Sequence, residues 1–373
     1  MKKHISYHFL ALVAILLVFG ATFLSVVSSI ASLNAFGNTH YYIFHQLIAI
    51  AIGLVIGFII FKIPLDIIKK FIPILLLINL ILVVIVLVPS LGTKFWGAKR
   101  WIIIGGTAFQ PSEFLKVTSI LYLALLLSKR SFEQTKTGWI SAAKKSYNAV
   151  TKVFVPFLLL LVVIFVILFL QKDLSTLGVI TIALLAVYFS ANTPLWHMAL
   201  TVGGMISAAA VAIRIEPFRF ERLMHFLKPE QDPLGIGFQL KQSLLAIGSG
   251  GIFGKGLGMS DQKFGFLPQS MTDSMFAILG EETGIIGCTV LVILFAAFFW
   301  QGIRIAKSSG DAFGRLAVIG IVTWIVAQAF LNICSSIGIW PLSGIPLPFF
   351  SYGGSHALTE LIGVAIILNI SKH

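Results

Sequence analysis

Charged residues are scarce in this 373-residue chain, at 11% of the total against 58% hydrophobic residues. Soluble globular domains carry about a quarter charged residues, so that class of protein is excluded. Cysteine is nearly absent as well, and Cys288 and Cys334 both lie in apolar segments. Two such residues exclude a disulfide framework and a cysteine-ligated metal centre, and we interpret both as core residues.

Acidic residues are also few, 14 against 27 basic ones, which gives a formal net charge of +13. In a membrane protein this excess favours anionic lipid headgroups or anionic substrates as partners. The chain has no nucleic-acid-binding motif, so nucleic acid is not predicted as a partner. The His, Cys and carboxylate residues lack the spacing of a dedicated metal site, so no cofactor is predicted, and assistance by a divalent cation stays open.

Long apolar runs fill most of the chain. A bilayer core about 30 Å thick needs about 20 apolar residues per helical span, and lipid offers backbone amides no other partner. We therefore predict an all-α polytopic membrane protein with ten transmembrane helices in a single domain, residues 1–373. The predicted spans are 9–30, 43–61, 71–88, 114–128, 153–170, 174–190, 195–213, 272–300, 315–336 and 356–370.

The first apolar run is longer than the core of a secretory signal and lacks a small-x-small cleavage site, so we interpret it as a span. The basic loop from Lys129 to Lys152 is typical of the cytoplasmic side. An even number of spans then places both termini in the cytoplasm, and a large extracytoplasmic loop, about 214–271, follows span seven. The predicted outer loops nevertheless keep many Lys and Arg residues, which a polyanionic substrate at the outer surface would explain.

Three acids lie in or at the edge of the eighth span, where ionisable groups are costly and therefore point to function. Asp273 lies at its outer end, and Glu281 and Glu282 lie inside it. On one helix, Asp273 and Glu281 would lie near one face, about 12 Å apart along the axis. We predict that Asp273 meets an outer-surface substrate and that the two glutamates tie helices together. A plainer role for Asp273, stabilisation of a helix N-terminus, stays open.

Three polar loops carry further candidates. In the run Gly248–Gly258, a phosphate-binding loop would need Gly in place of Ser249 and Ser or Thr in place of Gly256. We therefore interpret the glycines of this run as positions where backbone segments pack closely. The loop 91–116 gathers aromatic and charged side chains, a composition also typical of an interfacial belt. The loop 341–355 contains three prolines and three glycines, so it is stiffer and richer in turns than a simple connection between two spans needs. We expect this loop to have a defined shape and to form part of the rim of the site.

Five motifs in a ten-span frame resemble the SEDS family of cell-wall polymerases, which includes the rod-shape protein RodA and the division protein FtsW. The resemblance covers nearly the whole chain. The motifs are GAKRWIIIG with QPSEFLK (97–116), QKDLSTLG (171–178), DPLGIGFQLKQSLLAIGSGGIFGKGLG (232–258), FLPQSMTDSMFAILGEETGIIG (266–287) and GIPLPFFSYGGS (344–355).

The resemblance implies a peptidoglycan glycosyltransferase that polymerises lipid II at the outer face of the bacterial cytoplasmic membrane. Asp273 matches the family's essential acid, and it would be the general base for attack of a glucosamine 4-hydroxyl on the muramyl anomeric carbon. The implied substrate-binding residues are Lys99, Arg100, Glu113, Lys116, Asp173, Gln239, Lys255 and Ser351.

The connection GKGLGMSDQKFGFLP and the GEE triplet resemble the division-type FtsW, whereas GIPLPFF resembles RodA. We prefer the division type, which implies a septal location. The implied partners are lipid II, membrane lipid, a class B penicillin-binding protein transpeptidase and other division proteins. A lipid II flippase or transporter, a non-catalytic scaffold for the transpeptidase and a RodA-type elongation role remain alternatives.

The chain departs from the family pattern at five positions near these motifs. The departures are Lys172 for the usual Pro, Ser175 for Gly, Gln269 for Glu, Met271 for His and His356 for Ser. The central Asp273 is retained, so we still predict activity, but the neighbours of this carboxylate differ from the family's.

Overall fold

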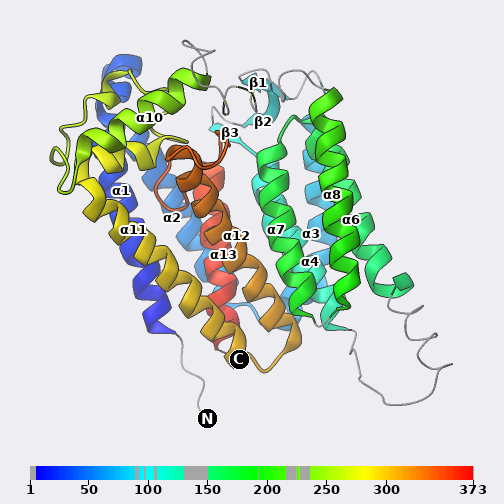
Figure 1. Cartoon of the computed structure of the whole chain (residues 1–373). Helices are drawn as coiled ribbons and strands as arrows, with labels where there is room; N and C mark the ends of the chain where they lie inside the picture. Colours follow the sequence, from blue (N-terminus) through cyan, green and yellow to red (C-terminus); the bar gives the residue numbers. More distant parts are fainter. Residues whose placement is uncertain are drawn as a thin grey trace.

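The computed structural model describes residues 6–88, 92–95, 98–104, 107–129, 150–191, 193–215, 224, 226 and 236–372. Its helices form a bundle that carries a small sheet and a short helix at one end, hereafter the sheet end (Figure 1). Most of the predicted basic inner loop and residues 216–235 of the predicted outer loop, apart from 224 and 226, lie outside the described residues.

The helices coincide closely with the predicted spans. They are α1 (Tyr7–Phe36), α2 (Tyr41–Lys62), α3 (Leu65–Ile85), α4 (Pro111–Ser128), α6 (Val155–Leu170), α7 (Leu174–Ser190), α8 (Leu195–Ile215), α10 (Ile236–Gly250), α11 (Met275–Ser308), α12 (Ala312–Ser336) and α13 (Gly354–Ser371). Each of the ten predicted spans overlaps one helix, and α10 lies in the segment predicted as outer loop.

Within the described residues, eight helices are long and apolar enough to cross a membrane, and α7 is an apolar helix of 17 residues. The protein is therefore a multi-pass helical membrane protein, and the count of ten crossings stays a prediction. The first residues of α1 and the end of α13 lie together, at the end opposite the sheet (Figure 1). Two termini on one side agree with an even number of crossings.

A three-stranded antiparallel sheet precedes α4, in a segment predicted as an irregular loop. Its strands, in spatial as in chain order, are β1 (Thr93–Phe95), β2 (Ala98–Ile104) and β3 (Thr107–Phe109). The isoleucine run in β2 has high β-propensity, which the all-α prediction overlooked. Helix α4 then begins at Pro111, three residues before the predicted span, because a proline needs no N–H donor at the first helical position.

The core of the bundle lies around α12, which packs against α4, α7, α11 and α13. Trp324 of α12 and Tyr188 of α7 are fully buried there. Helices α2 and α3 bury only 22% of their most apolar windows, so their surfaces face lipid. The bundle therefore has a buried centre around α12 and a lipid-facing periphery that includes α2 and α3.

The segment between α12 and α13, residues 337–353, turns back into the bundle and is hereafter the re-entrant loop. Its side chains Leu347, Phe349 and Phe350 are buried. A Cβ on Gly20 of α1 would lie 2.1 Å from the carbonyl oxygen of Phe349, so only glycine permits this approach. Irregular backbone at membrane depth is tolerated where protein encloses it, which is the case here.

Candidate functional site

Asp273 lies in a turn, two residues before the first residue of α11, and its side chain is half-buried. The expectation that Asp273 and Glu281 share a helical face is corrected, because the helix begins at Met275 and the acid stands outside it. The carboxylate remains close to the N-terminus of α11, so its position is also compatible with a role in stabilising that helix end.

The re-entrant loop and α12 hold the backbone around Asp273. Asn332 Nδ2 donates to the carbonyl oxygens of Asp273, at 2.9 Å, and Ile345, at 2.7 Å. Ser351 Oγ donates to the carbonyl of Thr272 at 2.5 Å, which places this predicted residue one position from the acid. A Cβ on Gly344 would lie 3.6 Å from Asp273 Oδ2, so the loop passes directly beside the carboxylate.

Helix α10 contacts the same turn through the predicted residue Gln239. Its Nε2 donates to Ser274 Oγ at 3.1 Å, and that hydroxyl donates to the carbonyl of Pro268 at 3.0 Å. Gln239 and Ser351 thus contact Ser274 and Thr272, the two residues that flank Asp273. The structure brings these predicted residues together at one turn.

Arg100 and Asp173 form a second predicted pair. Arg100 Nη1 of β2 lies 3.4 Å from Asp173 Oδ1, and the same guanidinium donates to the carbonyl of Lys172. Asp173 also caps α7, accepting from the backbone N–H of Thr176 at 3.4 Å. Adjacent strand residues point to opposite faces, so Lys99 points away from this pair.

The Arg100–Asp173 pair is connected to Asp273 through the re-entrant loop. Ser175, two residues after Asp173, donates from Oγ to the carbonyl of Ser343. Ser343 precedes Gly344, the residue beside the Asp273 carboxylate. This contact needs the Ser175 hydroxyl group, which the glycine expected from the family pattern would lack.

Glu113 and Lys116 lie in a separate, buried cluster on the first two turns of α4. Their grouping with Arg100 in one outer loop is corrected, because α4 begins at Pro111 and carries both side chains into the bundle. Lys116 Nζ donates to Glu113 Oε2 at 2.8 Å and to Gln328 Oε1 at 2.9 Å. Lys116 is 2% exposed, so it could contact a substrate only after a rearrangement.

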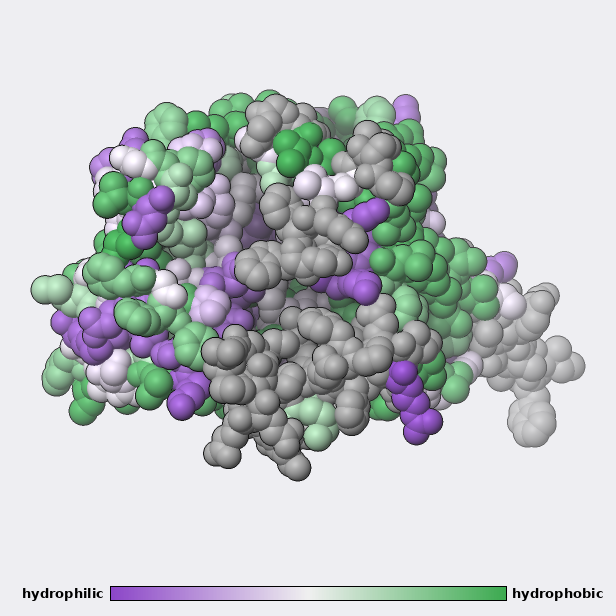
Figure 2. Space-filling model, turned by 90° about the horizontal axis from the view of Figure 1, so that it is seen from above, coloured by the Kyte–Doolittle hydropathy of each residue, from purple (hydrophilic) through white to green (hydrophobic). Residues whose placement is uncertain are grey.

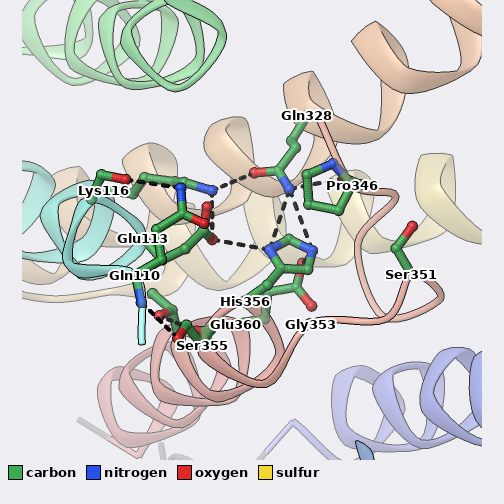
Figure 3. A network of polar contacts seen from close by, with 12 residues as sticks. Gln110, Glu113, Lys116, Gln328, Pro346, Ser351, Gly353, Ser355, His356 and Glu360 are labelled. Carbon is green, nitrogen blue, oxygen red and sulfur yellow. Dashed lines mark hydrogen bonds and ion pairs between the residues drawn. The ribbon is translucent and has the colours of Figure 1, made fainter. Parts of the chain in front are cut away.

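His356 completes this cluster between two carboxylates (Figure 3). Its Nδ1 lies 3.0 Å from Glu113 Oε2, and its Nε2 lies 2.9 Å from Glu360 Oε1. All four charged or titratable members, Glu113, Lys116, His356 and Glu360, are buried. Burial of charges is tolerable when they are paired, and a protonated imidazole together with the Lys116 ammonium would balance the two carboxylates.

The buried cluster also holds the re-entrant loop. Gln328 Nε2 donates to the carbonyl of Pro346 at 3.0 Å, and Glu360 Oε2 accepts from the backbone N–H of Phe349 at 3.0 Å. His356 was noted from the sequence only as a departure from the family pattern, and Gln328 and Glu360 were given no role. Polar residues within apolar spans were the available signal.

Lys255 lies on another segment, between α10 and α11. Its Nζ donates to Glu281 Oε1 at 2.7 Å and to Asp261 Oδ2 at 2.9 Å, and these hydrogen bonds raise the pKa of the ammonium group. Lys263 Nζ lies 3.5 Å from Glu282 Oε1. Glu281 and Glu282 therefore have the expected structural role, although they anchor a loop rather than a second helix. A phosphate contact of Lys255 stays a prediction.

Two side chains at the sheet end, Asp273 and Arg100, could take part in a reaction. A half-buried carboxylate such as Asp273 can accept a proton from a hydroxyl group. A partly exposed guanidinium such as Arg100 can bind a phosphate oxygen, although Asp173 already occupies one side of it. The re-entrant loop fixes the relative positions of the two groups.

Comparison with known proteins gives a consistent result over almost the whole chain. The family model FTSW_RODA_SPOVE, described as cell cycle protein, matches residues 7–373. Stage V sporulation protein E of Bacillus subtilis is 35% identical over 359 residues, covering 96% of this chain and 94% of that protein. A probable peptidoglycan glycosyltransferase FtsW of Trichlorobacter lovleyi is 36% identical over 367 residues, covering 97% and 92%.

Solved structures share the fold. A chain from a study of the structural coordination of polymerization and crosslinking by a peptidoglycan synthase complex superposes with a TM-score of 0.78. It is 23% identical, and the match covers 98% of this chain and 97% of that one. The rod shape determining protein RodA of Thermus thermophilus superposes with a TM-score of 0.69 at 23% identity, covering 98% and 96%. From the family model and the sequence relatives together, the chain belongs to the FtsW, RodA and SpoVE family.

Proposed function

We propose that this protein is a peptidoglycan glycosyltransferase that polymerises lipid II at the outer face of the bacterial cytoplasmic membrane during cell division. Relatives that carry the name peptidoglycan glycosyltransferase FtsW and cover more than nine tenths of the chain support the activity. The division role rests on the predominance of FtsW among these names, next to a sporulation protein. Both termini would lie in the cytoplasm and the sheet end outside.

The observation that carries this proposal is the fixed position of Asp273 beside the re-entrant loop. Asn332 and Ser351 hold the backbone of the turn, while the carboxylate itself is half-buried next to Gly344. A general base must be held in place and still reach its substrate, and this geometry provides both conditions.

In the proposed reaction, Asp273 takes the proton of the glucosamine 4-hydroxyl as its oxygen attacks the muramyl anomeric carbon. The new β-glycosidic bond forms as the α bond to undecaprenyl pyrophosphate breaks, and the pyrophosphate leaves with the bonding electrons. Cationic groups would stabilise this leaving group. Arg100 of β2, whose side chain is partly exposed, is better placed for this role than the buried Lys116.

The chain's departures around Asp273 leave neutral groups beside the proposed base. Gln269 stands where the family has Glu, and its Oε1 accepts from Thr272 Oγ1 at 2.9 Å. Met271 stands where the family has His, and its carbonyl accepts from the backbone N–H of Tyr352 at 2.9 Å. The proposed mechanism therefore assigns proton acceptance to Asp273 alone.

Purified protein incubated with fluorescent lipid II tests the proposal. The wild-type chain should make glycan strands that a muramidase digests, and Asp273→Ala should make none. Polymerisation by the variant would remove Asp273 as the base. Translocation of lipid II across vesicles without polymerisation would favour a flippase, and rescue of a depletion strain by Asp273→Ala would favour a non-catalytic scaffold.

A class B penicillin-binding protein is the proposed protein partner. The support is the fold shared with a chain of a peptidoglycan synthase complex that coordinates polymerisation and crosslinking. Co-purification of the two proteins from membranes, and the location of a fluorescent fusion at the septum or along the side wall, would separate a division role from an elongation role.

A further inference from the structure

We propose that residues 251–266, between α10 and α11, lie in the headgroup and acyl boundary of the outer leaflet and bind membrane lipid there. This segment, hereafter the lip, belongs to the part of the chain that the sequence assigned to an outer aqueous loop. The inference concerns the apolar face of the lip, not Lys255 or the turn that carries Asp273, and only the choice of the outer leaflet rests on the orientation given under the proposed function.

Large apolar side chains of the lip point outward. Phe253 is 80% exposed, and five others are between 60% and 69% exposed, namely Ile252, Leu257, Met259, Phe264 and Phe266. Leaving such a side chain in water rather than in an apolar environment costs about 1.5–3 kcal/mol. Six of them within 15 residues form a patch of the kind that marks a membrane or protein contact.

Both lysines of the lip pair with carboxylates of α11, whereas the side chain of Asp261, the third charged residue of the lip, is 74% exposed and pairs with Lys255. Lys263 is buried and pairs with Glu282, and Lys255 bridges Glu281 and Asp261. Glu281 also accepts from Ser260 Oγ at 2.5 Å, and Glu282 accepts from the backbone N–H of Gly258 at 2.9 Å. An aqueous loop would show the opposite arrangement, with lysines outside and apolar groups inside.

The lip is fixed to α11 by its backbone, so the outward apolar side chains are not a product of a loosely attached loop. Helix α11 breaks at Gly284, whose φ is +65°. The N–H groups of Ile285 and Ile286 donate to the carbonyls of Gly251 and Ile252, at 3.0 and 3.2 Å. In return, the N–H groups of Lys255 and Gly256 donate to the carbonyls of Glu281 and Glu282, at 2.9 and 3.0 Å.

The occupant of the patch is inferred from its continuity with the lipid-facing flank of α11. Ile285, Ile286 and Ile293 of that helix are 59%, 47% and 60% exposed, and the first two donate backbone bonds to the lip. The segment between α10 and α11 lies at the edge of the bundle beside α1 and α11 (Figure 1). Seen from the sheet end, hydrophobic residues are mixed with hydrophilic ones on the left side of the molecule, where this segment lies (Figure 2). The same bilayer that covers α11 would therefore cover the lip.

Site-directed spin labelling of the full-length protein in lipid nanodiscs tests this placement. In a background where Cys288 and Cys334 are replaced by Ala, a nitroxide is attached at Phe253→Cys or Phe264→Cys, one variant at a time. Ile293→Cys, on the exposed flank of α11, serves as the lipid control, and Ser308→Cys, at the far end of that helix, serves as the water control. Accessibility is measured with oxygen, which partitions into lipid, and with a water-soluble nickel chelate.

The proposal predicts that both lip labels favour oxygen as Ile293→Cys does, at a depth of about 5–10 Å below the headgroup boundary. Accessibility to the nickel chelate like that of Ser308→Cys would overturn it. Protection from both reagents would also overturn it, because the patch would then be covered by protein. A lip that is accessible to the chelate alone but becomes protected when a transpeptidase is added would identify a protein-docking surface instead.

Discussion

Asn332 Nδ2 lies 2.9 Å from the backbone carbonyl oxygen of Asp273, and the same amide donates to the carbonyl of Ile345 in the re-entrant loop at 2.7 Å. One side chain of α12 thus connects the turn that carries the acid with the loop beside it. Because Asn332 is fully buried, it is placed to position the acid without contacting substrate.

Asn332→Ala should lower kcat of lipid II polymerisation by about tenfold to a hundredfold with little change in KM, because small displacements of a catalytic group are costly. Asn369→Ala is the matched control. Asn369 is also fully buried and donates to two carbonyls, of Ile60 and Ile63 at 2.7 and 2.8 Å, but at the opposite end of the bundle. An equal loss of kcat in both variants would indicate that Asn332 has only a general structural role.

Removal of one partner from the buried cluster should cost more stability than removal of two. Lys116→Met leaves Glu113 with His356 as its remaining charged partner and should lower the free energy of unfolding by about 3–5 kcal/mol. Glu113→Gln combined with Lys116→Met should be less destabilising, since it removes one charge of each sign, whereas the single variant leaves two carboxylates around one imidazole. Thermal unfolding in detergent micelles compares the two, and a double variant at least as unstable as the single one would contradict this account.

Gly284→Ala should lower the free energy of unfolding by about 2 kcal/mol or more, because a side chain in that backbone conformation is strained. Its Cβ would also lie 2.4 Å from the carbonyl oxygen of Ile252. Gly203→Ala, in α8, is the control, because its Cβ would meet no atom within 4 Å and alanine favours the helix. Thermal unfolding of both variants should show a loss only at Gly284.

The ion pairs of Lys255 should stabilise the protein at neutral pH and less at alkaline pH. Its pKa is raised in the folded state, so the contribution is complete below the unfolded value of about 10.4 and is lost as pH rises further. A third of the side chain is exposed, so the contribution is about 0.5–1 kcal/mol. The difference in melting temperature between wild type and Lys255→Met should therefore shrink above about pH 10.4, and a difference that stays constant through this range would contradict the prediction.

The helical frame could be predicted because apolar length alone determines a span. Asp273 was predicted at one end of the eighth span, and it lies two residues before the first residue of α11. The missing parts depend on contacts between distant segments. Neither the return of the re-entrant loop into the bundle nor the meeting of Glu113 with His356, 243 positions apart, leaves a local pattern in the sequence.

The break of α11 at Gly284 shows the same limit at a smaller scale. Eight residues separate Asp273 from Glu281, a spacing that suggested one helical face, yet the helix begins after the acid and breaks after the glutamates. The backbone N–H groups of Ile285 and Ile286 at the break bond to carbonyls 34 positions earlier, and periodicity carries no information about such exchanges. The GSGGIFGKGLG run was correctly interpreted as close-packed backbone, because Gly250 and Gly254 approach the carbonyls of α11.

The central claim, that Asp273 is the general base, is tested most directly by the single-turnover rate of Asp273→Asn with fluorescent lipid II. The account predicts a loss of about 10²–10⁴-fold, with lipid II binding retained, because the amide keeps the shape of the carboxylate but accepts no proton. Asp261→Asn, at an exposed acid 12 positions earlier, should stay close to the wild-type rate. A wild-type rate for Asp273→Asn would contradict the assignment.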